Sequence, residues 1–444
     1  MTMLSSRTLL LSVLCSACST AQTESRPSRP HVVVIVSDDA GYADFGVQGA
    51  DDIRTPRIDS IARDGVRFSD GYVSGPVCSP SRAGLMTGRY QQRFGHELNI
   101  PPKFSEENGL PLTETTFADE MKAAGYRTIA LGKWHLGYAD KFHPCSRGFD
   151  SYWGFLQGAR SYFPLKKPTR LNRLLRDREV QPESFDYMTD ELGRQAAKYI
   201  EERGDEPLFV YLAYNAVHTP MHATEQDLEG LDGAQRRRKL VAMTHALDRS
   251  VGYVLDALDK EGIADDTLVF FVNDNGGATN NASENGALRG RKGTVWEGGI
   301  RVPFLARWPN GLPKGKVYDQ PVIALDLLPT CLSAAGAELR GELPLDGVDL
   351  LPHLRGQSDG APHEALLWRH GDAKWAVRCG AWKLVCNGGE TPELYQLVDD
   401  IGETVDLAQQ EPARVAEMQS RFERWAEQLV APRWSYGRKK ASKR

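Results

Sequence analysis

The sequence of 444 residues has few cysteines, no long apolar run and no excess of basic charge. Seven cysteines are too few for a disulfide scaffold, so each one has to be judged singly. No run of about eighteen apolar residues is present, so we expect no membrane-spanning helix. With 54 basic and 59 acidic residues the net charge is −5, which argues against nucleic acid as a partner. An anionic substrate would therefore need a local basic site.

The composition that remains is that of an ordinary globular protein. Apolar residues make up 41% and charged residues 25% of the chain, which excludes a disordered chain, a collagen-like repeat and a coiled coil. At about 150 residues per domain, the length allows two or three domains with a sizeable core.

The N-terminal segment is predicted to direct export and to lie outside the fold. A short apolar stretch at residues 9–14 is typical of a secretory signal and too short to span a bilayer. Because Cys15-Ser16-Ala17-Cys18 resembles a bacterial lipobox, residues 1–18 are interpreted as a signal peptide with Cys18 as the lipidation site. Cleavage near Ala21, giving a soluble periplasmic or secreted protein, remains the alternative. Residues 19–30 are predicted to be a linker, so a lipid anchor is the only membrane contact expected.

Apolar strand-like runs alternate with helical patterns through residues 31–320, the predicted main domain. This rhythm predicts a parallel sheet with helices on both faces. Strands are expected at 31–36, 128–131, 208–212 and 267–272, and helices at 115–124, 186–203 and 234–260.

Polar side chains follow each of the four predicted strands. In open α/β sheets ligands bind beyond the carboxyl ends of the strands, so these side chains should lie on one rim. Asp and Asn are also common turn residues, but four such endings together favour a functional site. The residues concerned are Asp38 and Asp39, Lys133 and His135, His218, and Asp274 and Asn275.

Residues 321–435 are predicted to form a smaller α+β subdomain with an antiparallel sheet. Helices are expected at 322–335 and 412–430, a hairpin at 374–386 and a strand at 394–397. Cys379 and Cys386 flank the tip of the hairpin and could pair in an oxidising compartment. Residues 436–444 are interpreted as a basic tail.

The densest chemistry lies at Cys78-Ser79-Pro80-Ser81-Arg82. Ser79 followed by Pro80 predicts a helix capped by Ser79, with Cys78 just before its N-terminus. The positive end of a helix favours an anion there, so a thiolate nucleophile is one interpretation of Cys78. A buried, inert cysteine is the other.

This segment strongly resembles the Cys-x-Pro-Ser-Arg signature of the type I, formylglycine-dependent sulfatases, in which the cysteine is oxidised to Cα-formylglycine. The resemblance covers roughly residues 31–430, and residues 92–97 and 147–150 look like the arylsulfatase and N-acetylgalactosamine-6-sulfatase branch. Further motifs match in the family's order: Ser37-Asp38-Asp39, Thr87-Gly88-Arg89, Gly132-Lys133-Trp134-His135-Leu136-Gly137, His218-Thr219-Pro220, Asp274-Asn275-Gly276-Gly277, Gly290-Arg291-Lys292-Gly293 and Trp296-Glu297-Gly298-Gly299.

The resemblance implies an alkaline-phosphatase-like α/β fold and a role for each group. A divalent cation would be held by oxygen ligands, which suits Ca²⁺, with Mg²⁺ as the alternative. Its ligands would be Asp38, Asp39, Asp274, Asn275 and residue 78 as formylglycine. Arg82, Lys133 and Lys292 would neutralise the formylglycine hydrate and the sulfate oxygens.

In the implied reaction one hydroxyl of the hydrated aldehyde attacks sulfur, and His218 or Lys292 protonates the departing alcohol. His135 then takes a proton from the second hydroxyl, which expels sulfate. The expected substrate is a sulfated carbohydrate, attacked at a terminal sugar of a polysaccharide or glycosaminoglycan. His96, Arg160 and His222 lie in loops that could contact the sugar. The expected partner protein is a formylglycine-generating maturation enzyme.

Two other functions stay open at the level of the sequence. One is a phosphomonoester or phosphonate monoester hydrolase, because the implied fold is shared with such enzymes. The other is an unprocessed lipoprotein that binds sulfated glycans without cleaving them, because Cys78 is inert for this chemistry until it is oxidised.

Overall fold

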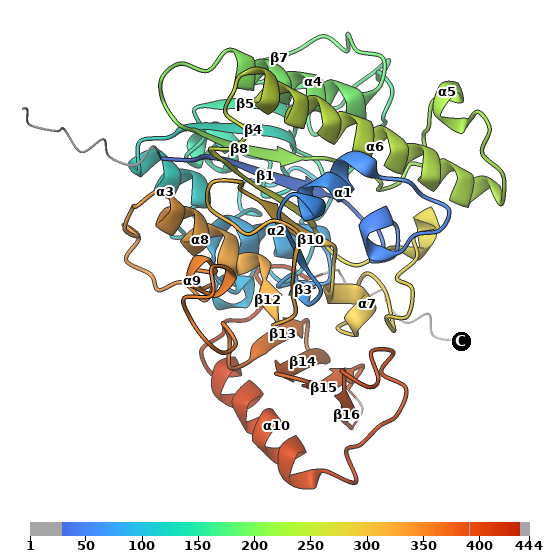
Figure 1. Ribbon diagram of the computed structural model, residues 1–444, viewed down its shortest axis with the longest axis vertical. Coiled ribbons are helices and arrows are strands. Elements are labelled where there is room, and N and C mark those ends of the chain that lie inside the picture. Colours follow the sequence, from blue (N-terminus) through green and yellow to red (C-terminus); the bar gives the residue numbers. More distant parts are fainter. Residues whose placement is uncertain (1–28, 390, 436–444) are drawn as a thin grey trace, which may run out of the picture.

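A large mixed sheet forms the centre of the molecule (Figure 1). The computed structural model describes residues 29–389 and 391–435, and within these ranges the sheet has ten strands in the order β11-β2-β10-β9-β1-β8-β4-β5-β6-β7. The strands are β1 (His31–Ser37), β2 (Val66–Phe68), β4 (Arg127–Lys133), β5 (Ser151–Phe155), β6 (Leu175–Arg176), β7 (Glu179–Val180), β8 (Leu208–Ala213), β9 (Thr267–Asn273), β10 (Phe304–Arg307) and β11 (Lys316–Tyr318).

The middle of this sheet is parallel, as the sequence predicts. Strands β9, β1, β8, β4 and β5 pair in parallel, whereas β10 runs antiparallel to both of its neighbours. In β1 the β-branched run after His31 is fully buried, because helices cover both faces of the sheet. All four strands predicted for the main domain are confirmed, with ends that differ by one or two residues.

Helices form a layer on each face of the sheet (Figure 1). On one face α1 (Pro56–Arg63), α4 (Met188–Glu201) and α6 (Gln235–Lys260) pack on the side chains of Val33, Ile35 and Leu212. On the other face α2 (Cys78–Thr87), α3 (Phe117–Ala123), α8 (Leu327–Ala334) and α9 (Leu351–Leu354) pack on those of Val34 and Tyr211. Two short helices, α5 (Glu225–Leu228) and α7 (Glu297–Ile300), lie in connecting segments.

A second sheet lies at the C-terminal end of the molecule (Figure 1). Within the described residues it has four antiparallel strands in the order β13-β14-β15-β16 and is covered by α10 (Pro412–Ala426). The strands are β13 (Leu366–His370), β14 (Lys374–Cys379), β15 (Trp382–Asn387) and β16 (Glu393–Gln396). The predicted hairpin and the antiparallel sheet are therefore confirmed. The domain boundary at residue 320 stays a prediction, and α8 and α9 pack in the same core as α2 and α3.

Two details of the C-terminal prediction are wrong. The helix expected from residue 322 begins only at Leu327, because Val322 and Ile323 form the short strand β12 (Val322–Ile323), which pairs with β3 (Gly71–Tyr72). The last helix ends at Ala426 rather than at residue 430.

Cys379 and Cys386 are also not bonded to each other. Cys379 lies opposite Trp382 at the hairpin tip, whereas Cys386 lies opposite Trp375 near the other end of the hairpin. The two side chains are therefore several rungs apart along the ladder.

Several predicted segments lie outside the described residues. These are the signal peptide at 1–18 with the candidate lipidation site Cys18, the basic tail at 436–444, and the linker at 19–30 apart from its last two residues. No helix within the described ranges is both long and apolar enough to cross a membrane.

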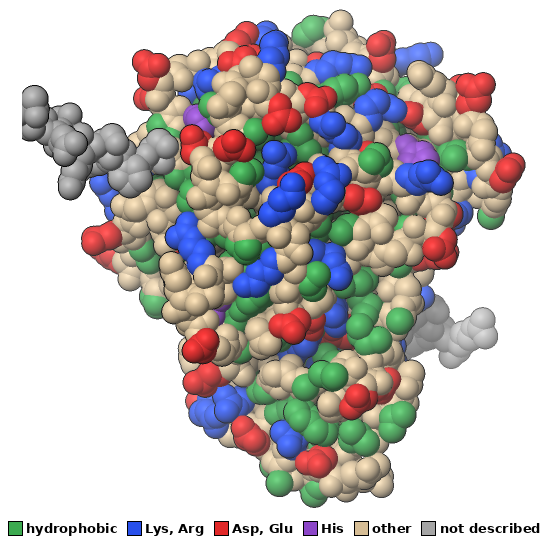
Figure 2. All heavy atoms as spheres, viewed as in Figure 1, with side chains coloured by type: hydrophobic (Ala, Val, Ile, Leu, Met, Phe, Trp, Pro, Cys, Tyr) green, Lys and Arg blue, Asp and Glu red, His purple; other side chains and the backbone are tan. Residues whose placement is uncertain are grey.

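On the face drawn in Figure 2, basic and acidic side chains are interspersed over the larger part of the molecule. This face offers no broad basic surface.

Candidate active site

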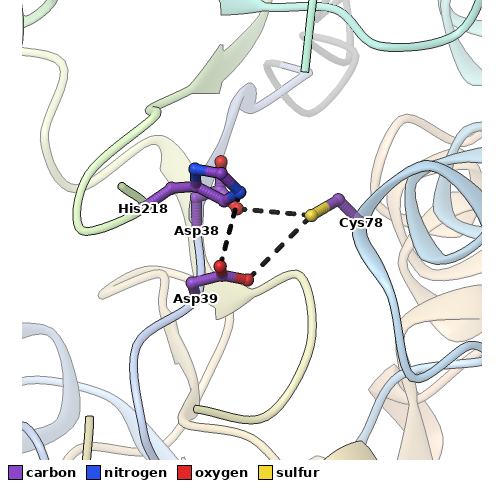
Figure 3. Close-up of side chains that lie close together, drawn as sticks. All are labelled: Asp38, Asp39, Cys78 and His218. Atoms are coloured by element: carbon purple, nitrogen blue, oxygen red, sulfur yellow. Dashed lines mark hydrogen bonds and ion pairs between the residues drawn. The ribbon is translucent and has the colours of Figure 1, made fainter. Parts of the chain in front are cut away.

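The carboxyl ends of β1, β4, β8 and β9 bring the predicted rim residues together. These four strands are neighbours in the sheet, so the polar residues that follow them converge at one edge. One ligand atom from each of Asp38, Asp39, Cys78 and His218 lies within 4.8 Å of the others (Figure 3). The Sγ atom of Cys78 is 3.5 Å from Oδ1 of Asp38 and 4.0 Å from Oδ1 of Asp39.

Helix α2 delivers Cys78 to this edge, but it begins two residues earlier than predicted. Val77 precedes the helix in an extended conformation, and Cys78 is its first residue. Ser79 therefore does not cap the helix: its Oγ donates to the carbonyl of His135 (2.7 Å), and its backbone N–H is taken by Oδ1 of Asn99 (2.9 Å). Pro80 is tolerated because backbone N–H groups in a first helical turn lack helical acceptors in any case.

All ten residues of α2 are buried, and Arg82 reaches the site from its second turn. Its guanidinium bonds to Oδ2 of Asp274 (2.9 Å) and lies 3.8 Å from Oδ2 of Asp38. The helix ends at Gly88, whose φ of 64° is the left-handed conformation that glycine adopts readily.

Three cations face the three carboxylates of the site. Lys133 is ion-paired to Asp38, with both side chains fully buried. Nζ of Lys292 lies 2.5 Å from Oδ1 of Asp39 and 3.2 Å from Sγ of Cys78. Arg82 pairs with Asp274. With three cations and three carboxylates, the formal charges of these side chains sum to zero.

This environment shifts the pKa values of the acids in different directions. Burial alone would raise the pKa of Asp39, but Lys292 and His218 outweigh burial and hold it well below the usual range. In Asp274, by contrast, burial and the charge of Asp38 raise the pKa despite Arg82. Burial and the nearby charge of Asp274 raise the pKa of Cys78 to about 12. The thiolate interpretation of Cys78 is therefore disfavoured.

Several oxygens of the site are suited to a divalent cation. Among the described residues, Oδ2 of Asp39 and Oδ1 of Asn275 are buried and accept no hydrogen bond. The amide of Asn275 is oriented by its Nδ2, which donates to Oδ1 of Asp39 (2.8 Å). Buried oxygens without donors are costly unless a cation meets them, and oxygen ligands suit Ca²⁺ or Mg²⁺. The donor set therefore fits the predicted metal site.

The two predicted proton-transfer histidines both lie close to this cluster. His135 has a φ of 59° and is 6% exposed, and among the described residues its Nδ1 has no hydrogen-bond partner. Burial, followed by the charges of Lys133 and Arg82, lowers its pKa well below the usual value. The imidazole is therefore neutral near pH 7 and able to accept a proton.

His218 is oriented by its neighbours. Its Nδ1 contacts the carbonyl of Thr219 (2.6 Å), and because a carbonyl only accepts, Nδ1 carries the proton. Its Nε2 faces the cluster, 3.5 Å from Oδ2 of Asp39. The hydroxyl of Tyr162 lies 2.8 Å from the carbonyl of His218 and steadies the same turn.

The three residues expected to contact a sugar differ in position. His96 is fully buried against the start of α2, 2.7 Å from Oγ of Ser79, so it is not placed to touch a sugar. Arg160 is also buried and is ion-paired to Glu183. His222 is partly exposed, and its Nδ1 lies 3.3 Å from Oγ of Ser161.

One residue at this edge was missed from the sequence. Asn215 lies two residues past the end of β8, as Asp39, His135 and Asn275 lie two residues past the ends of β1, β4 and β9. Asn215 is 1% exposed, and neither polar atom of its carboxamide has a partner among the described residues. The signal in the sequence is this shared offset from the strand end.

The chain matches the family model described as Sulfatase over residues 30–337. N-acetylgalactosamine-6-sulfatase of Mus musculus is 33% identical over 380 residues, which cover 80% of this chain and 72% of that protein. Steryl-sulfatase of Mus musculus is 29% identical over 470 residues, covering 83% of this chain and 75% of that protein.

Among solved structures, the crystal structure of Ps i-CgsB in complex with k-i-k-neocarrahexaose has a TM-score of 0.87 and 35% sequence identity. The match covers 91% of this chain and 94% of that one. The fold is accordingly the alkaline-phosphatase-like α/β fold expected from the resemblance.

Proposed function

The chain belongs to the sulfatase family and is a sulfuric ester hydrolase, and we propose that it removes sulfate from a sulfated carbohydrate. Two similar proteins support this substrate class: one is named for a sulfated sugar, and the other is described in complex with a neocarrahexaose. The attacking position is recessed, because Cys78 is 1% exposed. A recessed site favours a sulfated sugar at a chain end over one in the middle of a polymer.

The observation that carries the proposal is the position of Cys78 between carboxylates and cations. Its Sγ lies close to Asp38, Asp39 and Nζ of Lys292, while Arg82 and Lys133 are both ion-paired to Asp38. A sulfate group held next to residue 78 would meet this positive charge as its own charge shifts in the transition state.

The oxygens of Asp38, Asp39, Asp274 and Asn275 are proposed to hold a divalent cation, with Ca²⁺ as the first choice and Mg²⁺ as the second. Such a cation supplies charge stabilisation for the sulfate and lowers the pKa of a bound hydroxyl. Nothing else in the proposed chemistry depends on which of the two ions is bound.

An unmodified thiol at residue 78 suits this reaction poorly, because its raised pKa of about 12 keeps it protonated. We therefore propose that a maturation enzyme converts Cys78 to Cα-formylglycine. The hydrated side chain would supply one hydroxyl to attack sulfur and a second whose deprotonation releases the sulfate.

The chain's own proton carriers suit the two halves of this reaction. Nε2 of His218 and Nζ of Lys292 both face the cluster, so the proton for the alcohol that leaves would come from Lys292, or from His218 when Nε2 carries a proton as well as Nδ1. His135 is proposed to take the later proton, since its lowered pKa keeps it neutral, so that a ring nitrogen is free to accept that proton. Removing either histidine should lower kcat on the order of a hundredfold to ten-thousandfold.

The decisive experiment compares sulfate and phosphate esters of the same sugar or aryl alcohol. We expect kcat/KM to favour the sulfate ester, and Cys78→Ala, the matched control, to abolish that activity. A clear preference for phosphate would instead support the phosphomonoester or phosphonate monoester hydrolase considered above. A screen of defined sulfated mono- and oligosaccharides would then identify the sugar and the sulfate position.

Mass spectrometry of the peptide that contains residue 78 tests the modification. Protein from the native host should have lost the thiol there and gained an aldehyde or its hydrate. An intact thiol in that protein would favour the non-catalytic glycan-binding lipoprotein.

Export to the bacterial periplasm or outer membrane is proposed from the N-terminal sequence alone. Mass spectrometry of the N-terminal peptide distinguishes an anchored lipoprotein from a soluble exported protein. A lipidated Cys18 would support an anchored lipoprotein, and an unmodified start near residue 22 would support cleavage after Ala21 and a soluble protein.

A further inference from the structure

The segment that presents Lys292 to the site is a loop with one turn of its own, closed by Thr294, whose N–H and Oγ1 both donate to the carbonyl of Arg291 (3.0 and 2.7 Å). Residues 289–297, here called the Lys292 loop, join the site to α7 and contain Gly290 and Gly293, both with φ of 84°. Two backbone bonds tie the loop to the main domain: Lys292 N–H to the carbonyl of Gly277 (3.1 Å) and Gly293 N–H to that of Pro76 (2.8 Å). A loop with two glycines and two such ties needs further support to hold a charged side chain in place.

At its start, the loop is supported by residues from the C-terminal part of the chain. The guanidinium of Arg289 lies over the ring of Trp296, 3.6 Å from its centroid, and so closes the loop on itself. Its Nη1 donates to the hydroxyl of Tyr395 (2.9 Å) and the carbonyl of Glu403 (2.8 Å), both beyond the hairpin β14–β15.

The middle of the loop rests on one rung of the C-terminal sheet. Nζ of Lys374 donates to the carbonyl of Gly293 (2.6 Å), next to Lys292 itself. Oδ1 of Asn387 accepts from the N–H of Val295 (3.3 Å). Lys374 and Asn387 are directly opposite each other on β14 and β15, so the two contacts come from one cross-strand pair.

The end of the loop is held by buried charges from the same sheet. The carboxylate of Glu297 accepts from Nζ of Lys383 (2.8 Å), which is fully buried in β15. The backbone N–H of Glu297 donates to Oε2 of Glu403 (2.8 Å). All three parts of the loop are thus fastened to residues that follow β13.

We propose that the C-terminal sheet is a positioning device for Lys292, with Lys374 as its principal positioning residue. This inference rests on the proposed function, in which Lys292 supplies positive charge and a proton to the reaction. The polar contacts found for Cys78 among the described residues are with Asp38, Asp39 and Lys292, so Lys374 acts only through the loop. A displacement of the reacting groups by about 1 Å costs about a hundredfold in rate.

Lys374 also offers the cleanest perturbation. It is half-buried, and its polar contact among the described residues is one backbone carbonyl, so Lys374→Met removes that bond and keeps most of the aliphatic chain. The matched control is Lys316→Met, because Nζ of Lys316 likewise donates to a backbone carbonyl, that of Leu354 (2.9 Å), away from the loop. Lys374→Arg keeps a donor and should restore much of the function.

The test is a double-mutant cycle with Lys292→Ala, measured as kcat and KM on a sulfate ester. We expect Lys374→Met to lower kcat tenfold to a hundredfold, with KM changed less than threefold and Tm within the range of the Lys316→Met control. In the Lys292→Ala background the same substitution should have no further effect on kcat. An equal loss in both backgrounds, or no loss in either, would overturn the proposal.

Hydrogen exchange of the peptide that spans the Lys292 loop keeps this test independent of the proposed function. Lys374→Met should speed exchange there relative to native protein, whereas Lys316→Met should not. Unchanged exchange would overturn the positioning role even if the protein hydrolysed no sulfate ester. Absence of sulfatase activity in the native protein, with faster exchange in Lys374→Met, would instead refute only the proposed function.

Discussion

Gly158→Ala tests the position of His135 without touching the histidine itself. A Cβ atom at residue 158 would lie 2.4 Å from Cε1, 2.5 Å from Nε2 and 2.8 Å from Nδ1 of the His135 ring. Because carbon atoms pack at about 3.5 to 4.0 Å, the ring or the loop has to move by about 1 Å. A shift of that size costs about a hundredfold in rate, or about 2.7 kcal/mol of transition-state free energy.

The matched control is Gly204→Ala, since a Cβ there would meet no atom within 4 Å. We expect kcat to fall about a hundredfold in Gly158→Ala and to stay at the native value in the control. Stability should fall by about 1–3 kcal/mol in Gly158→Ala, the usual effect of overpacking, which urea denaturation measures.

The kinetic assay also requires the Gly158→Ala substitution in His135→Ala protein. In His135→Ala the space beside residue 158 is open, so adding Gly158→Ala should leave the residual kcat unchanged. Native kcat in Gly158→Ala, in protein shown to be folded, would refute the argument that the position of this ring limits turnover.

Three further predictions concern stability and ions. Burial raises the pKa of Glu403 to about 7, above its ordinary 4.5, so the stability that this group contributes is present below about pH 4.5 and is lost as the pH rises through 7. As the pH rises from 4.5 to 7, the free energy of unfolding measured by urea denaturation should fall by up to about 3 kcal/mol more in native protein than in Glu403→Gln. Parallel pH curves for the two proteins would contradict this prediction. Asn215→Ala removes a carboxamide without partners among the described residues, so calorimetry should give a Tm equal to or above that of native protein, and a clear fall would show that the amide is satisfied in the folded state. Chelation should abolish activity and lower Tm, because Asp38, Asp39 and Asp274 then lose the proposed divalent cation and keep only their ion pairs with Lys and Arg, and both should return with added Ca²⁺. Full activity after exhaustive chelation would rule out the metal.

Much of the site could be predicted because it follows from local patterns and one topological rule. The β-branched run after His31 and the polar residues after each strand identify a parallel sheet and its ligand-binding edge. In the structure Asp39, His135, Asn215 and Asn275 all lie two residues past a strand end. Past the predicted strand ends His135 lies four residues on and the other three lie three, so a search of those two positions after each apolar run would have added Asn215.

The features that sequence reasoning missed depend on contacts between distant segments. The helix start at Cys78 rather than Pro80 depends on Ser79, whose hydroxyl is engaged by His135 and whose N–H is engaged by Asn99. The local sequence predicts a helix at Val322 and Ile323, but in the structure these residues form a strand that pairs with β3. No local pattern indicates that Lys374 reaches the carbonyl of Gly293, because propensity and periodicity describe only near neighbours.

The burial of α2 has a consequence for when residue 78 could be modified. Cys78 is 1% exposed, and α2 is covered by side chains from much later in the sequence, with Leu325 and Leu328 packed against its glycines. An enzyme that oxidised this side chain, as proposed above, could not reach it in the folded protein. The proposed modification would therefore have to compete with folding, during the interval in which residue 78 has been synthesised and the segment around Leu328 has not yet docked. On this proposal a chain that folded first would keep its thiol, and the fraction of active protein would depend on timing as well as on sequence.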